Sequence, residues 1–471
     1  MNWLGYAHSL DAVKAIIAEV SPGVASSMGD LEFLVCMRKA REREVENIVA
    51  AIKAFDTDSS GTIDTSELEE LIHYLGYVPN NEATADAIKD AGVGTTELDL
   101  HTLWKFLRVY RMRDGFSRAE TAEVEAAFKR YDRDDIGEIG TFDIGKALRW
   151  LGIQTSFDKQ QYLSELVDVD HSGKLNSSEF RKLIRMYWED ELKLMQTAFV
   201  AAAKGATETI THKQAADAFM SINFIDALGE PPIRALKKKN ATEGVGLSGF
   251  LRAGLTYKQQ ARLAYRENAG FTSEELEKLQ DFFAEVDVDE SGTIDKHELL
   301  NLIRKVFPTM TPSIRAAIEE LMRELEAKGG RGVARGIDFG DFTRMMRQFF
   351  DIQTREKIQK ERVAVREAGF TPQEVHDMRE LFIMSARGSG TEITLPEVTE
   401  MIARICPCGP HTRAEATSVF LEVVPGGEAA AASMSEAGQQ RMDFPEFLRL
   451  MRKLLDKNFG NIQLYWGEAQ P

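Results

Sequence analysis

The chain of 471 residues has few cysteines and no long uncharged stretch. Its three cysteines, Cys36, Cys406 and Cys408, cannot supply a disulfide framework, and no spacing of Cys with His is that of a zinc site. No uncharged run approaches the roughly 20 residues that a membrane helix needs, and the N-terminus lacks a basic segment leading into an apolar one. The sequence therefore predicts a soluble protein of a reducing compartment, the cytoplasm, without a membrane span.

Basic charge is also in short supply. There are 75 acidic against 58 basic residues, for a formal net charge of -17. This sign of charge argues against nucleic-acid binding and favours the binding of cations or basic partners. The sequence also lacks a nucleophile–base motif, a glycine-rich phosphate-binding loop and a dinucleotide fingerprint, so we expect no enzyme activity.

What the chain does contain is a recurring acidic pattern. The stretch DTDSSGTIDTSE, Asp56 to Glu67, alternates oxygen-bearing side chains, and Gly61 permits a sharp bend. Ca²⁺ takes about six to eight oxygen ligands, which a twelve-residue loop can supply from positions 1, 3, 5, 7, 9 and 12. The predicted ligands are the side chains of Asp56, Asp58 and Ser60, the carbonyl of Thr62, Asp64 through water, and both oxygens of Glu67.

Apolar residues at helical spacing precede and follow this loop, which predicts a helix, a loop and a second helix. In this arrangement the sequence resembles the EF-hand superfamily, in the form found in calmodulin and troponin C. The resemblance implies an all-α fold, a tandem array of paired helix–loop–helix motifs with short β bridges between the loops. Two further loops, DVDHSGKLNSSE and DVDESGTIDKHE, are complete. Their predicted ligands are Asp168, Asp170, Ser172, the Lys174 carbonyl, Asn176 through water and Glu179, and then Asp287, Asp289, Ser291, the Thr293 carbonyl, Asp295 through water and Glu298.

A fourth loop, DRDDIGEIGTFD, keeps only part of the pattern. Ile136 and Gly140 remove the ligands at positions 5 and 9, and Asp143 is shorter than the usual glutamate at position 12. A short carboxylate there suits Mg²⁺ or weak Ca²⁺ binding better than tight Ca²⁺ binding. We therefore expect three Ca²⁺ sites, with this fourth loop either empty or weakly occupied. Its remaining candidate ligands are Asp132, Asp134, the Glu138 carbonyl and Asp143.

The same spacing of apolar positions continues through six segments that have lost their ligands, which we call silent hands. The resemblance implies that loop position 8 of one hand forms a β bridge with position 8 of its neighbour. Because one helix–loop–helix motif cannot bury its own apolar face, we expect the hands to fold in pairs, the third and fifth without a working site. The predicted bridges are Ile63 with Leu98, Ile139 with Leu175, Ile210 with Val245, Ile294 with Ile337, and Ile393 with Met442.

Three capping boxes support this division into pairs. They are formed by Ser117 with Glu120, Thr272 with Glu275, and Thr371 with Glu374. The predicted units are an unpaired half at residues 1–39, pair 1 at 40–114, pair 2 at 115–186, degenerate pair 3 at 187–269, pair 4 at 270–368 and degenerate pair 5 at 369–471. The stretch from 353 to 369 is interpreted as a solvated helix that continues from the fourth pair.

The unpaired half places Met28 at position 8 and Phe33 at the start of the next helix, and its partner hand is missing. Either the sequence is a fragment of a longer chain, or this apolar face packs on another pair, another copy or a partner.

Together these features predict a calcium-ion-binding protein. We expect a Ca²⁺-responsive sensor or adaptor in which filled loops open a groove for an amphipathic partner helix. The alternative is a structural or scaffolding protein of a large assembly, such as a cytoskeletal array, in which the ions stiffen the chain. A passive Ca²⁺ buffer is a third hypothesis. The identity of the target, the oligomeric state and the choice between extended and compact arrangements of the pairs stay open.

Overall fold

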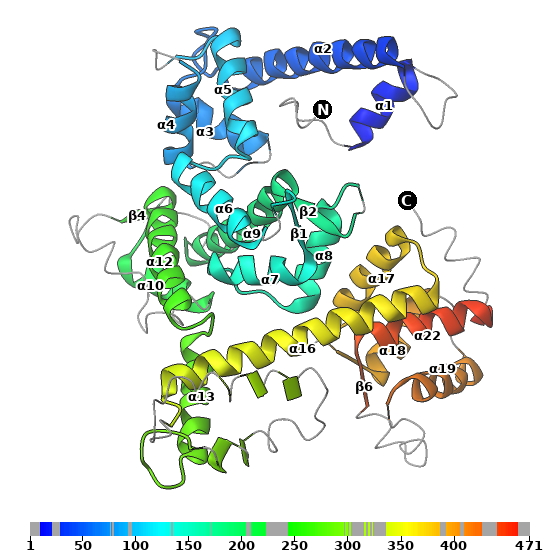
Figure 1. Cartoon of the computed structure of the whole chain (residues 1–471). Coiled ribbons are helices and arrows are strands. Elements are labelled where there is room, and N and C mark those ends of the chain that lie inside the picture. Colours follow the sequence, from blue (N-terminus) through cyan, green and yellow to red (C-terminus); the bar gives the residue numbers. More distant parts are fainter. Residues whose placement is uncertain are drawn as a thin grey trace. The chain divides into compact units, whose positions relative to one another are not determined.

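The computed structural model consists of helices joined by loops and short β bridges (Figure 1). Contacts divide the chain into two compact units, Met1–Lys129 with Phe180–Gln196, and Arg130–Glu179 with Thr197–Pro471. The residues that the structure describes are 10–20, 29–75, 77, 80–92, 97–132, 135–170, 172–203, 209–222, 244–295, 297–299, 301–302, 315–316, 319–320, 323, 336–386, 392–405, 409–425 and 440–459.

The first unit contains the first predicted pair. Its helices are α1 (Leu10–Val20), α2 (Asp30–Phe55), α3 (Thr65–Tyr74), α4 (Asn81–Asp90), α5 (Leu100–Met112), most of α6 (Arg118–Tyr131) and part of α9 (Ser177–Ala203). Ile63 and Leu98 exchange backbone hydrogen bonds of 2.9 and 2.8 Å, as predicted. Below this bridge, apolar residues of α2, α3, α4 and α5 share one core, so the hand with ligands and its silent neighbour bury each other's apolar faces.

Polar side chains fix where these helices begin. Asn80 accepts hydrogen bonds from the first turn of α4, and Asp99 does the same for α5. At the start of α6, the Ser117 amide donates to the Glu120 carboxylate over 2.8 Å and the Glu120 amide donates to Ser117 Oγ over 3.3 Å. The predicted capping box is therefore confirmed, and so are those at Thr272 and Thr371.

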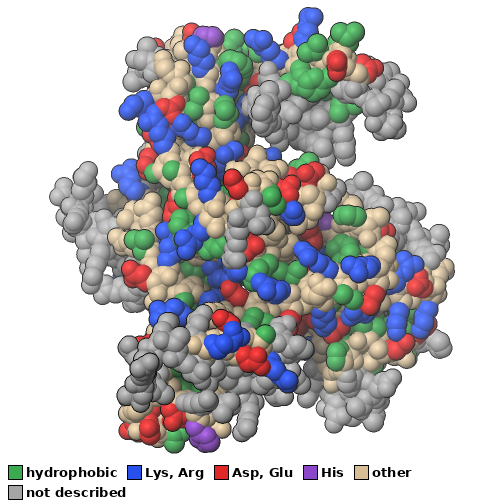
Figure 2. Space-filling model, viewed as in Figure 1, with side chains coloured by type: hydrophobic (Ala, Val, Ile, Leu, Met, Phe, Trp, Pro, Cys, Tyr) green, Lys and Arg blue, Asp and Glu red, His purple; other side chains and the backbone are tan. Residues whose placement is uncertain are grey.

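The predicted unpaired half leaves an apolar surface. α1 packs on α2 through a small core of Ile16, Cys36 and Ala40. Near the start of α2, Leu31 is 78% and Leu34 61% exposed, and Figure 2 shows hydrophobic side chains gathered there. Phe33 and Val35 are also exposed. The predicted position-8 residue Met28 lies outside the described residues, as do Cys406 and Cys408.

The second unit contains the remaining predicted bridges. The strands pair antiparallel, β1 (Glu138–Gly140) with β2 (Lys174–Asn176), β3 (Thr209–Ile210) with β4 (Val245–Gly246), and β5 (Ile393–Thr394) with β6 (Arg441–Met442). Ile139 lies opposite Leu175, Ile210 opposite Val245, Ile393 opposite Met442, and Ile294 opposite Ile337 in an isolated bridge. All five predicted bridges are thus confirmed, while the boundaries of the six predicted units stay a prediction.

The helices of this unit flank those bridges. They are α7 (Thr141–Trp150), α8 (Phe157–Val167), the ends of α9, α10 (His212–Ser221), α12 (Leu247–Glu267), α13 (Ser273–Val286), α16 (Phe339–Ala368), α17 (Pro372–Ser385), α18 (Leu395–Ile405), α19 (Pro410–Val423) and α22 (Phe444–Asp456). Among the described residues, no helix is both long and apolar enough to cross a membrane.

Helix α16 departs from its prediction in one respect. Its 30 residues do continue the fourth pair as a single helix, shown in yellow in Figure 1. The interpretation of its second half as solvated is wrong, because Ile358, Ala364 and Ala368 are buried. They are covered because α16 packs along α22 and also contacts α7. A charged sequence with a narrow stripe of small apolar residues therefore forms an internal contact.

Candidate metal centres

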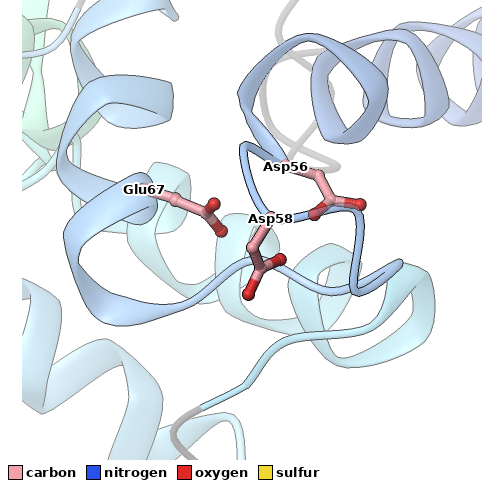
Figure 3. A group of neighbouring side chains, drawn as sticks. All are labelled: Asp56, Asp58 and Glu67. Atoms are coloured by element: carbon pink, nitrogen blue, oxygen red, sulfur yellow. The ribbon is translucent and has the colours of Figure 1, made fainter.

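The first acidic loop brings three carboxylates together (Figure 3). Asp56 follows the last residue of α2, Asp58 lies in the loop, and Glu67 lies in the first turn of α3. One oxygen from each lies within 4.8 Å of the others. Gly61 has a φ of 79°, which glycine adopts without strain, and its amide donates to Asp56 Oδ2 over 2.8 Å. The amide of Ser60 donates to Oδ1 of both aspartates over 2.9 Å.

Glu67 is 7% exposed and is held in the loop by hydrogen bonds. Its Oε1 accepts from the Thr57 amide over 2.8 Å and its Oε2 from the Asp64 amide over 3.1 Å. The hydroxyl of Thr57 also donates to Oε1 over 2.7 Å, and these bonds lower the pKa of the Glu67 carboxyl. Sequence reasoning missed Thr57. Its signal is a hydroxyl at position 2, where the other complete loops have Val169 and Val288.

The other two complete loops repeat this geometry. In each, the position-1 carboxylate accepts the amides of positions 5 and 6 at 2.8 to 3.0 Å. The position-12 carboxylate accepts the amides of positions 2 and 9 at 2.8 to 3.3 Å. Ligand atoms of positions 1, 3 and 12 again lie within 4.8 Å of one another. These groups are Asp168, Asp170 and Glu179 in one loop, and Asp287, Asp289 and Glu298 in the other.

The remaining predicted ligands occupy matching places in all three loops. Each position-5 hydroxyl donates to the carbonyl at position 7, at 3.3 Å for Ser60 and Thr62, 3.1 Å for Ser172 and Lys174, and 2.8 Å for Ser291 and Thr293. Each position-9 side chain accepts the amide of position 12, at 2.9 Å for Asp64, 3.0 Å for Asn176 and 2.8 Å for Asp295. Position 9 thus caps the next helix, which suits a ligand that reaches an ion through water.

The electrostatics favour a cation. Hydrogen bonds from the position-5 serine lower the pKa of the position-3 carboxyl in each loop, which keeps Asp58, Asp170 and Asp289 ionised. Desolvation, by contrast, raises the pKa of Asp168. Several carboxylates held this close repel one another, and a divalent cation relieves that repulsion. Oxygen-only donor sets of this kind are those that Ca²⁺ and Mg²⁺ prefer.

The Asp132 loop keeps the backbone turn but assembles fewer ligands. Asp132 accepts the amides of Ile136 over 3.0 Å and Gly137 over 2.9 Å, as position 1 does in the complete loops. Ile136 is 55% exposed at the place of the position-5 ligand. The position-12 residue Asp143 lies 3.6 Å from Lys146 Nζ. Of the other predicted ligands, Glu138 opens β1 and Asp134 lies outside the described residues.

In the silent fifth pair, the position-12 glutamates have other partners. Glu397 accepts the Thr394 amide over 2.8 Å. Glu446 forms a capping box with Asp443 and also accepts Lys360 Nζ of α16 over 2.8 Å, while Asp443 accepts the same ammonium group over 2.5 Å. A protein cation therefore neutralises the acidic groups of this loop, a contact that local sequence spacing does not reveal.

The fold and these loops define a helical protein with paired hands and acidic, oxygen-rich loops. Residues 121–185 match the EF-hand domain pair family, and residues 48–72 and 279–303 match the EF hand family. Calcium-binding protein CML19 of Arabidopsis thaliana is 30% identical over 149 residues, which cover 31% of this chain and 83% of that protein.

Two other relatives cover a similar share. Caltractin of Naegleria gruberi is 24% identical over 144 residues, 31% of this chain and 81% of that protein. Putative calmodulin-like protein 6 of Oryza sativa subsp. japonica is 24% identical over 152 residues, 31% of this chain and 86% of that protein. The chain therefore belongs to the EF-hand calcium-binding proteins of the calmodulin superfamily.

Proposed function

We propose that the protein is a non-enzymatic, Ca²⁺-responsive binding protein that takes up three ions. The observation that carries this proposal is the threefold repetition of one carboxylate geometry, with the ligand atoms of positions 1, 3 and 12 within 4.8 Å in each loop. The proposed ligands are those predicted above for the loops that begin at Asp56, Asp168 and Asp287. The Asp132 loop binds Mg²⁺ or Ca²⁺ weakly or stays empty, because positions 5 and 9 offer no side-chain oxygen.

The response to the ion follows from position 12. Glu67 and Glu179 lie in the first turn of the helix that leaves their loop, and Glu298 lies in the helical residues 297–299 after its loop, so a shift of that carboxylate onto an ion moves the helix with it. In sensor hands this motion exposes an apolar groove, and an amphipathic helix of a target protein is the partner that such a groove fits. Figure 2 shows charges of both signs interspersed over the visible face, so recognition there rests on exposed apolar surface rather than on a single-sign patch.

A hydrophobic dye tests this response. Ca²⁺ is expected to raise the fluorescence of a bound environment-sensitive dye, whereas Mg²⁺ alone is not. The triple variant E67Q/E179Q/E298Q should lose the increase. The variant E70Q removes a negative charge from an exposed site on α3 and should retain it. No increase at saturating Ca²⁺ with the unmodified chain would count against a sensor.

A scaffold is the second candidate, and the long helices favour it. α9 has 27 residues and α16 has 30, and each continues beyond the hand in which it begins. In a scaffold, ions would order the loops without opening the pairs. Small-angle scattering distinguishes the two, because a stiffened scaffold keeps its radius of gyration on Ca²⁺ addition, whereas a sensor changes it. A passive buffer differs from both in retaining no protein partner when Ca²⁺ is added.

A further inference from the structure

Helix α8 has two roles in the second unit. At its C-terminal end it leads directly into a complete loop, where the amide of Asp168 donates to the Ser164 carbonyl over 3.0 Å. Along its side it packs against α17, the first helix of the silent fifth pair. The helix that presents the first ligand of one loop is therefore also in contact with a pair that has no complete loop.

A buried arginine lies at the centre of this contact. The guanidinium of Arg379 on α17 is 0% exposed. Its Nε and Nη2 donate to the two carboxylate oxygens of Glu165 on α8 over 3.0 and 2.9 Å, a bidentate pair. Nη2 also donates to Glu361 on α16 over 2.6 Å. The Arg379 guanidinium lies 4.0 Å from the ring centroid of Phe444, which completes its enclosure. We call Glu165, Arg379 and Glu361 the arginine clamp.

Arg379 favours the charged forms of both clamp carboxyls, but desolvation keeps the pKa of Glu361 raised, whereas the pKa of Glu165 is lowered. Desolvation would raise the pKa of Glu165, but His376, whose Nδ1 lies 3.5 Å from Oε2, and the charge and hydrogen bonds of Arg379 outweigh it, so its pKa is lowered. His376 also stacks on Tyr162 of α8, with ring centroids 4.8 Å apart. Removing one partner of such a buried pair leaves an uncompensated charge in the interior, so a substitution of either Arg379 or Glu165 should disfavour the docked arrangement.

The clamp and the Asp168 loop border the same cavity. A cavity of about 290 Å³ lies beside the clamp. One side is formed by Asp168 and Lys174 of the loop, and the other by Val365 of α16 and Phe370 of the turn that follows. Glu165 itself lies three residues before Asp168. A displacement of α8 relative to α17 therefore changes the position of the loop's first ligand.

In the structure the clamp is docked, and the ligands of the Asp168 loop converge at the same time. Glu179 accepts the amides of Val169 and Asn176, and its carboxylate lies within 4.8 Å of those of Asp168 and Asp170. An ion binds best to the arrangement in which its ligands already converge. Coupling between two such events is reciprocal, so whatever stabilises docking also stabilises ion binding.

We propose that the silent fifth pair is an intramolecular partner of the second pair, and that the arginine clamp couples its docking to Ca²⁺ binding at the Asp168 loop. Docking raises the Ca²⁺ affinity of this loop, and Ca²⁺ tightens the docking. This inference rests on the proposed occupancy of that loop, and it gives a pair without a working site a role in binding the ion.

The test uses the full chain with E67Q and E298Q, so that the Asp168 loop is the remaining complete site. Ca²⁺ is titrated by calorimetry into this reference and into versions that also carry R379Q or E165Q. Both are expected to weaken the Kd of this site by about 5- to 150-fold, the usual range of coupling between two sites. The control R404Q removes an exposed arginine of α18, which pairs with Glu400 in the same fifth pair, and should leave the Kd within about twofold.

The sign of the R379Q effect separates coupling from simple electrostatics. Loss of a positive charge near the loop would, by Coulomb attraction alone, tighten Ca²⁺ binding. Weaker binding by R379Q therefore supports coupling through docking. E165Q is on α8 and leaves the core of the fifth pair intact, but it removes a negative charge, and the lost Coulomb attraction would by itself weaken Ca²⁺ binding. Its effect therefore supports coupling only where R379Q weakens binding as well. An unchanged Kd in both variants, or a tighter one in R379Q, would overturn the inference. A reference chain that takes up no Ca²⁺ would instead overturn the proposed function, and the inference with it.

Discussion

The substitution Phe106→Ala tests whether a silent hand supports its binding neighbour. Phe106 lies on α5, in a hand without ligands, and is fully buried. It belongs to the same core as Leu71 and Ile72 of α3, the helix that begins with the position-12 region of the Asp56 loop. Its ring lies 5.5 Å from that of Tyr110. Truncation should therefore destabilise both hands, although it changes only the silent one.

The magnitude follows from burial. Replacing a fully buried Phe by Ala costs about 3–5 kcal/mol, because transfer free energy is lost and a cavity remains. Each 1.4 kcal/mol is about tenfold in an equilibrium constant, so the open state of the pair should become roughly 100- to 4,000-fold more populated. Amide hydrogens of α3 that exchange through this opening should exchange faster by the same factor.

Hydrogen exchange measured by mass spectrometry provides the assay, on peptides that cover Thr65–Tyr74. The control is Leu100→Ala on the same helix α5, where the side chain is 38% exposed and the cost should be well below 1 kcal/mol. If Phe106→Ala accelerates exchange in α5 but leaves exchange in α3 unchanged, the stability of one hand does not depend on the core packing of the other, and the reasoning is refuted.

Two other predictions concern a buried carboxyl and the incomplete loop. Burial raises the pKa of Asp158 to about 7 from an ordinary 3.8, so its contribution to stability is full below pH 3.8 and is lost as the pH rises through about 7. Between pH 4 and pH 8, the free energy of unfolding of Asp158→Asn should therefore rise relative to that of the unmodified chain, by at most about 4 kcal/mol. If the difference between the two free energies stays constant over this range, this assignment is contradicted. Ile136→Asp restores the position-5 ligand at an exposed place, and Asp143→Glu lengthens the half-buried position-12 carboxylate, so calorimetry should then count one additional Ca²⁺ site. An unchanged stoichiometry would show that the backbone of this loop prevents binding.

The loops and bridges could be predicted from sequence because their determinants are local. Ligand spacing, the glycine at position 6 and the apolar residue at position 8 all lie within twelve residues, and hands that are adjacent in the chain pair with each other. For this reason Ile210 and Val245 could be predicted to pair although neither flanks a metal ligand. The structure confirms that bridge.

The arginine clamp could not be predicted in this way. Glu165 and Arg379 are 214 residues apart in sequence, and an arginine among charged helical residues is ordinarily solvated. The second half of α16 is predicted to be solvated for the same reason, since its buried stripe includes small residues such as Ala364 and Ala368. The contact of Lys360 with Glu446 is equally non-local, so only tertiary structure reveals that a protein cation neutralises this loop.

Calorimetric titration of the full chain with Ca²⁺, beside the variant E67Q/E179Q/E298Q, tests the central claim most directly. Each substitution keeps the shape of the position-12 side chain and removes its charge. The unmodified chain is expected to bind three ions, and the variant should lose most of the heat, while E70Q on the exposed face of α3 keeps it. Uptake that is undiminished in the triple variant, or absent from the unmodified chain, would contradict the account.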